Sequence, residues 1–148
     1  MLKQMLTKEY MISNARPKDW ENAIEIAGKL LVDNGNVKAE YVQAMIDVVS
    51  EMGPYIVLCP GVAFAHARPE SGTIKPGISL AILEAPIEFG HETNDPVKIV
   101  MAFAGKDHNS HLEMLVELSN ILQDEKALER LVGARSIEDI EGLLNDYS

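Results

Sequence analysis

Three short apolar runs in the middle of the chain constrain its fold more than any other feature of the sequence. They cover residues 55–59 (YIVLC), 78–83 (ISLAIL) and 97–103 (VKIVMAF), and glycine- or proline-containing turns separate them. Their apolar character is largely continuous rather than alternating, which is typical of strands that are covered on both faces. Residues 10–13 are predicted to add an edge strand. These patterns predict a sheet that lies between two other layers.

Helical patterns flank these runs. Apolar residues recur at helical spacing over residues 19–34 and 39–52, and a glycine follows each stretch. After the last run, residues 110–113 (SHLE) have the form of a capping box, in which Ser110 is the N-cap and His111 lies in the first helical turn. The segment that begins there is predicted to continue as a helix.

Shorter helices are predicted near the end of the chain, over residues 125–132 and 137–144. Helices therefore precede and follow the sheet-forming runs. The fold class expected from this order is α/β: one domain over residues 1–148, with a single mixed β-sheet flanked by helices on both faces.

Charge and cysteine content exclude several classes of protein. The 148 residues include 13 basic and 23 acidic side chains, and the net charge of −10 argues against nucleic-acid binding and against anionic membrane surfaces. The longest stretch without charge or histidine covers only residues 52–65, whereas a spanning helix needs about 20 apolar residues. Direct membrane insertion is therefore not expected. The single cysteine, Cys59, excludes an internal disulfide and a zinc site built on several thiolates. No signal peptide is recognisable, and we expect a cytoplasmic protein.

His66 is the first candidate for chemistry, since the sequence has no P-loop, GxGxxG, HExxH or GxSxG motif. It is predicted to lie in a loop over residues 61–72 (GVAFAHARPESG), between small alanines that leave its imidazole approachable. Arg68, two residues on, is able to hold a phosphoryl or carboxylate group bidentately. The alternative interpretation is a surface histidine without a role, with Arg68 paired to Glu70.

His111 is the second candidate, because the start of a helix presents unpaired amides to an anion. The alternative is a polar residue that merely begins a helix. His108 and His111 are spaced like two metal ligands, but no cysteine or acidic pattern accompanies them, so no metal site is expected. His91, within FGHETNDP, is predicted to cap a turn. Cys59 is predicted to be a buried, inert thiol.

Together these segments resemble enzyme IIA of the bacterial phosphoenolpyruvate-dependent sugar phosphotransferase system (PTS), in its fructose–mannitol family and most closely its ascorbate-type branch. AHARPE, FGHETNDPV and NSHLE follow one another at the spacing of that family. Ala65 stands where the family usually has proline, and His91 where close relatives have asparagine. The segments that carry the resemblance are residues 19–35, 53–72, 86–115 and 118–126.

The resemblance implies a function and roles for the candidate residues. It implies that His66 accepts a phosphoryl group from the phosphocarrier protein HPr and passes it to a cysteine of enzyme IIB. His111 is then the second active-site histidine, and Arg68 and Ser110 are the expected phosphate-binding residues. An imidazole is a competent nucleophile at neutral pH and a good leaving group once protonated, so no metal ion or other cofactor is needed.

Two readings of the resemblance stay open. The first is a carrier that serves the transport of ascorbate or a related sugar. The alternative is a regulatory IIA-like module whose phosphorylation state controls protein partners instead of transport.

Overall fold

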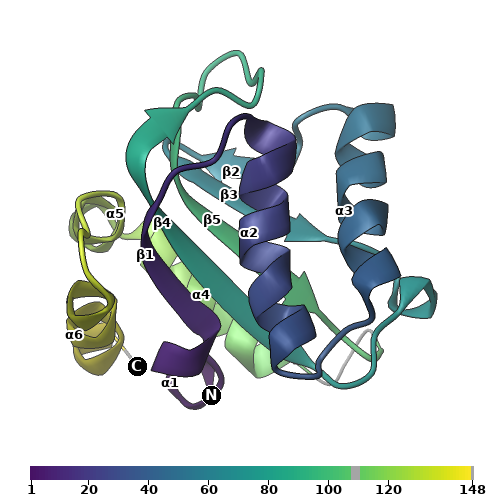
Figure 1. The fold of residues 1–148 in the computed structure, drawn as a ribbon. Coiled ribbons are helices and arrows are strands. Elements are labelled where there is room, and N and C mark those ends of the chain that lie inside the picture. The colour runs from purple at the N-terminus through teal and green to yellow at the C-terminus, as the bar shows by residue number, and fades with distance from the viewer. Residues whose placement is uncertain (108–110, 148) are drawn as a thin grey trace.

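A single sheet of five strands forms the centre of the computed structural model, which describes residues 1–107 and 111–147 (Figure 1). The strands are β1 (Met11–Ala15), β2 (Val57–Cys59), β3 (Val62–His66), β4 (Gly77–Ile87) and β5 (Val97–Ala104). Their order across the sheet is β1-β4-β5-β3-β2. β1 is parallel to β4 and β3 is parallel to β5, whereas the β4–β5 and β2–β3 pairs are antiparallel. The sheet is mixed and β1 is an edge strand, as predicted.

Helices cover both faces of this sheet, which confirms the predicted α/β fold (Figure 1). α2 and α3 lie over one face, and α4, α5 and α6 lie over the other. The short α1 was not predicted from the sequence, and it packs against α4 and α6. None of the described helices is long and apolar enough to cross a bilayer. The helices are α1 (Leu2–Met5), α2 (Trp20–Asp33), α3 (Ala39–Met52), α4 (Leu112–Gln123), α5 (Glu125–Val132) and α6 (Ile137–Tyr147), and single 3-10 turns cover Lys8–Tyr10 and Pro69–Ser71.

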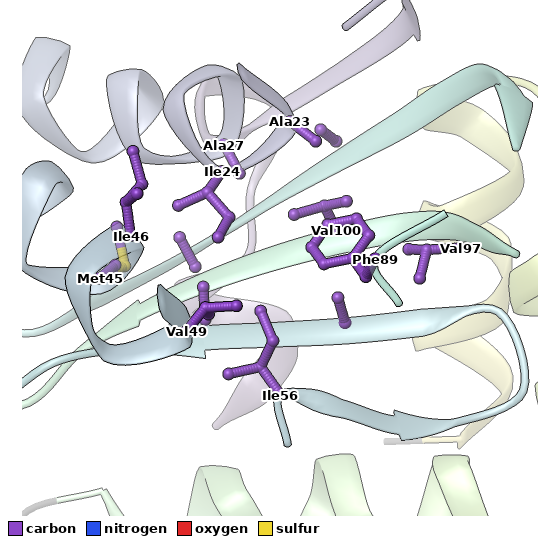
Figure 2. Close-up of a cluster of buried hydrophobic side chains, with 14 of the residues drawn as sticks. Ala23, Ile24, Ala27, Met45, Ile46, Val49, Ile56, Phe89, Val97 and Val100 are labelled. Carbon is purple, nitrogen blue, oxygen red and sulfur yellow. The ribbon is translucent and has the colours of Figure 1, made fainter. Parts of the chain in front are cut away.

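Buried apolar side chains fill the space on each side of the sheet. Neighbouring residues of β5 point to opposite sides: Val100 and Ala102 face α2 and α3, whereas Ile99 and Met101 face the other helices. This two-sided burial explains why the β5 sequence is apolar without alternation. Figure 2 shows part of the cluster on the α2–α3 side, including Ala23, Ile24, Ala27, Met45, Ile46, Val49, Ile56, Phe89, Val97 and Val100.

Residues 57–66 form a hairpin, so the predicted strand over 55–59 and the predicted loop over 61–72 are both partly wrong. The first strand is shorter, and β3 occupies the start of the predicted loop. Cys59 pairs with Val62, so Pro60 and Gly61 make the turn between the two strands. Gly61 has φ of +85°, a conformation that glycine adopts without steric cost.

β3 escaped detection because two of its five residues are alanines, which are depleted in strands. Ala63 and Ala65 are fully buried and face the α2–α3 side, whereas Val62 and Phe64 face α4. Tertiary packing therefore outweighs the low strand propensity of alanine at these positions.

Candidate functional site

His66 is the last residue of β3 and lies where β3 and β5 end together. The register pairs His66 with Phe103, next to the last residue of β5. Because the two strands are parallel, their carboxyl ends meet at one edge of the sheet, where α/β proteins commonly bind ligands. The side chain is exposed, and its imidazole has no hydrogen bond to another described residue. The strand thus holds the backbone of His66 while the ring stays accessible.

A cleft of about 790 Å³ opens beside His66. One wall comes from α3, and the others come from residues 66–69, the end of β5 and the start of α4. Arg68 lines the same cleft, so the structure brings His66 and Arg68 together. No ion pair joins Arg68 to Glu70 among the described residues, and the pairing offered as the alternative for Arg68 is therefore not found.

Aromatic rings connect His66 to His111. The ring of Phe64 lies 5.9 Å from the His66 imidazole and 5.7 Å from the ring of Phe103, measured between centroids. Phe103 in turn meets His111 edge-on at 6.2 Å. The two histidines therefore lie at the ends of one continuous row of rings.

Both ring nitrogens of His111 are buried and have no hydrogen-bond partner within the described part of the chain. A buried polar group without a partner costs about 1–3 kcal/mol of folding free energy. An oxygen atom of a bound ligand would satisfy such a nitrogen. The ring nitrogens of the His111 imidazole are therefore buried, unlike those of an ordinary surface residue.

α4 begins slightly later than the sequence predicted. Leu112 is its first residue and His111 is the N-cap, with φ of −134°, so the prediction that His111 lies in the first turn is wrong. The predicted N-cap, Ser110, lies outside the described residues, as does His108. No side chain of the described residues caps the first turn. The positive end of the helix dipole therefore still acts next to the His111 imidazole.

Tyr41, within the helix predicted over residues 39–52, is a residue of this region that the sequence analysis did not single out. It comes from α3 and is fully buried. Its hydroxyl accepts a hydrogen bond from the amide of Ala67 at 3.0 Å and donates to the carbonyl of Phe103 at 2.7 Å. The carbonyl of Ala67, at 3.1 Å, is an alternative acceptor for the same phenolic proton. A tyrosine on an otherwise apolar face was the available signal, because a buried phenol needs a hydrogen-bond partner.

Cys59 is half-buried beside Leu58, Phe64 and Leu115. Burial raises the pKa of its thiol, which disfavours the reactive thiolate. The raised pKa agrees with the predicted inert thiol, whereas the side chain is half-buried instead of buried as predicted. Within residues 1–107 and 111–147, no three His, Cys, Asp or Glu side chains are grouped as a metal site would require.

His91 lies at the opposite end of the sheet, in the connection between β4 and β5. Its Nδ1 accepts hydrogen bonds from the amides of Thr93 at 3.2 Å and Asn94 at 3.0 Å. The carboxylate of Asp95 accepts from the His91 amide at 3.0 Å and also from the two amides that precede it. His91 therefore caps this turn, which confirms its predicted role.

Comparison with known proteins identifies the family of this chain. The family described as "Phosphoenolpyruvate-dependent sugar phosphotransferase system, EIIA 2" matches residues 4–147. The chain belongs to this family. The family predicted from the sequence is thus confirmed, and the match extends over nearly the whole chain.

Curated relatives within the PTS family include the ascorbate-specific PTS system EIIA components of Escherichia coli strain K12 and Shigella flexneri. Each is 39% identical to this chain over 132 residues, which cover 88% of this chain and 86% of the relative.

Among solved structures, the mannitol-specific cryptic phosphotransferase enzyme IIA of Escherichia coli is 33% identical, with a TM-score of 0.85 and coverage of 98% of both chains. Enzyme IIA for mannitol in complex with phosphorylated enzyme IIB, also from Escherichia coli, is 30% identical, with a TM-score of 0.80. That match covers 95% of this chain and 96% of the other.

Proposed function

We propose that this PTS EIIA protein is a phosphotransferase component that takes a phosphoryl group from phospho-HPr onto His66 and passes it to a cysteine of enzyme IIB. The observation that carries the proposal is the exposed imidazole of His66, which has no hydrogen bond to another described residue and lies beside Arg68 at the shared carboxyl end of β3 and β5. Membership of the family supports a phosphoryl-carrying role for that imidazole.

The transfer to His66 conserves atoms and electrons without a cofactor. A lone pair of a His66 ring nitrogen attacks the phosphorus atom of phospho-HPr. The phosphorus–nitrogen bond of the donor breaks, and the donor imidazole keeps the electron pair. In the second step, a thiolate of enzyme IIB attacks the same phosphorus. The His66 nitrogen then leaves with its electron pair and takes up a proton.

Such transfers depend mainly on in-line positioning and on stabilisation of negative charge. Arg68 shares the cleft with His66 and is suited to hold phosphoryl oxygens bidentately. His111 adds buried ring nitrogens that have no partner in residues 1–107 and 111–147, next to the start of α4. We assign His111 to charge stabilisation and keep Ser110, from the segment before α4, as an expected phosphate-binding residue.

Two relatives suggest what lies downstream of this carrier. The 39% identity to ascorbate-specific EIIA components supports ascorbate or a related sugar as the transported compound. The 30% identical enzyme IIA that was solved with phosphorylated enzyme IIB supports enzyme IIB as the acceptor. The net charge of −10 suits docking to a basic surface on the phosphocarrier.

The proposal is tested with the purified protein, phosphoenolpyruvate, enzyme I and HPr. Intact mass should increase by one phosphoryl group, and the modification should be labile in acid and stable in alkali, as phosphoramidates are. Addition of an ascorbate-type enzyme IIB should then remove the modification and place it on the IIB cysteine. An unchanged mass would contradict the proposal. A phosphoprotein that never discharges to enzyme IIB would instead support a regulatory IIA-like module.

A further inference from the structure

We infer that Tyr41 is a positioning residue for phosphoryl transfer, because its buried hydroxyl holds together the two strand ends that carry the reactive imidazole and its neighbour. The inference rests on the proposed function, since it assigns a role around His66. It concerns a side chain that lies behind the site and touches neither the phosphoryl group nor a partner protein.

The hydrogen bonds of Tyr41 reach both strand ends at once. In one of them the hydroxyl accepts from the amide of Ala67, the residue directly after His66, at 3.0 Å. In the other the hydroxyl donates to the carbonyl of Phe103 at 2.7 Å. Phe103 is the β5 residue that lies opposite His66 of β3. A single hydroxyl from α3 therefore links the backbone that follows His66 to the backbone of β5.

The second of these links also reaches His111. The centroid of the Phe103 ring lies 6.2 Å from that of the His111 imidazole and 5.7 Å from that of the Phe64 ring. Phe64 in turn lies next to the His66 imidazole. A shift of the Phe103 backbone would move this row of rings. The hydroxyl of Tyr41 thus influences the placement of His66 directly through the chain and that of His111 through Phe103.

The chemical state of Tyr41 suits this task. Burial raises the pKa of its phenol, and the hydrogen bond with Ala67 only partly opposes that effect. The phenol therefore keeps its proton at neutral pH and is able to donate and accept at the same time.

The deciding variant is Tyr41→Phe, which keeps the ring and removes only the hydroxyl. Transfer from phospho-HPr is measured by rapid quench at several HPr concentrations. The maximal rate constant should fall about 10- to 100-fold, since small misplacements of reacting groups have effects of that order. The HPr concentration that gives half-maximal rate should not change, because Tyr41 is fully buried and out of reach of a docked protein.

Tyr10→Phe is the matched control. The Tyr10 hydroxyl donates to Oδ1 of Asn36 at 2.7 Å, so the same group is removed from a packed, hydrogen-bonded phenol that does not contact the strand ends at His66. Both variants should lose stability, measured by urea unfolding, but only Tyr41→Phe should slow the transfer. Wild-type transfer by Tyr41→Phe, or equal slowing in the two variants, would overturn the inference.

A second measurement separates this inference from the proposed function. The imidazole signals of His66 and His111 in ¹⁵N NMR spectra of the unphosphorylated protein should shift in Tyr41→Phe and stay in place in Tyr10→Phe. If the wild-type protein accepts no phosphoryl group, the proposed function fails, and unmoved imidazole signals would then refute the positioning role as well. If Tyr41→Phe does not fold, hydrogen exchange of the wild-type protein decides: a rapidly exchanging Ala67 amide would contradict the inference.

Discussion

The two ends of the central sheet each carry a histidine, and the two imidazoles are held in opposite ways. At one end, His66 closes β3 with an exposed ring that has no hydrogen bond to another described residue. At the other end, in the β4–β5 connection at the top of Figure 1, His91 accepts the amides of Thr93 and Asn94 on Nδ1. Asp95 secures the same turn by accepting further amides.

This difference shows how one residue type serves structure or chemistry. A ring nitrogen that accepts backbone amides has its lone pair occupied, so it stabilises a turn and is a poor nucleophile. A ring nitrogen that accepts no hydrogen bond keeps its lone pair for an incoming group. Backbone geometry at the end of a strand therefore prepares His66 without using its side chain.

The largest expected effect separates the two ends directly. His66→Ala should abolish the mass gain of one phosphoryl group after incubation with phosphoenolpyruvate, enzyme I and HPr, because the accepting nitrogen is gone. His91→Ala should still gain the group, since its Nδ1 is committed to the turn. A phosphoryl group that persists in His66→Ala would show that His66 is not the acceptor and would contradict the assignment of chemistry to that end of the sheet.

A smaller effect is expected for His111, which we take to be a stabiliser rather than an acceptor. Removal of one donor from a preorganised site commonly lowers the rate by about 10²–10³. His111→Ala should therefore still be phosphorylated on His66, but more slowly by about that factor, and His111→Gln should recover part of the loss. Rapid-quench kinetics measure both variants after circular dichroism has shown that they are folded. Wild-type rates in both would leave His111 as an ordinary residue at a helix start.

For His91 the expected effect is on stability alone. His91→Ala removes the acceptor of two backbone amides and should lower the free energy of unfolding by about 1–3 kcal/mol, at about 0.5–1.5 kcal/mol for each hydrogen bond. His91→Asn should recover much of this loss, because an asparagine side chain also accepts amides two residues on. Urea unfolding measures the stability. A slower phosphoryl transfer in a fully folded His91→Ala protein would contradict the purely structural role.

The smallest effect on transfer is expected at Cys59. Cys59→Ser should accept and pass on the phosphoryl group at the wild-type rate, since burial raises the pKa of the thiol and the proposed chemistry uses imidazoles. A hydroxyl that is left without a partner would lower stability by about 1–3 kcal/mol. An added chelator should also leave the rate unchanged. A folded Cys59→Ser protein that accepts no phosphoryl group would require thiol chemistry in place of the proposed mechanism.

Most helices and strands could be predicted from the sequence because their signals are local. The helix over residues 39–52 was predicted with the bounds that the structure has, and β5 was predicted to within one residue. β3 could not be recognised, because its alanines have low strand propensity and only burial under α2 and α3 favours them there. The start of α4 was misplaced by the capping-box pattern, since cap residues are defined by backbone geometry rather than by residue type.

The sequence by itself determined the layered α/β class, the turn role of His91 and the candidate residues His66, Arg68 and His111, since apolar periodicity, turn residues and short motifs lie within single segments of the chain. Tertiary structure decided that His66 ends a strand beside Phe103, and that Tyr41 on α3 joins both strand ends. Contacts of this kind link segments far apart in the chain. They depend on strand register and on the packing of α3 against the sheet, and neither can be read from a local pattern.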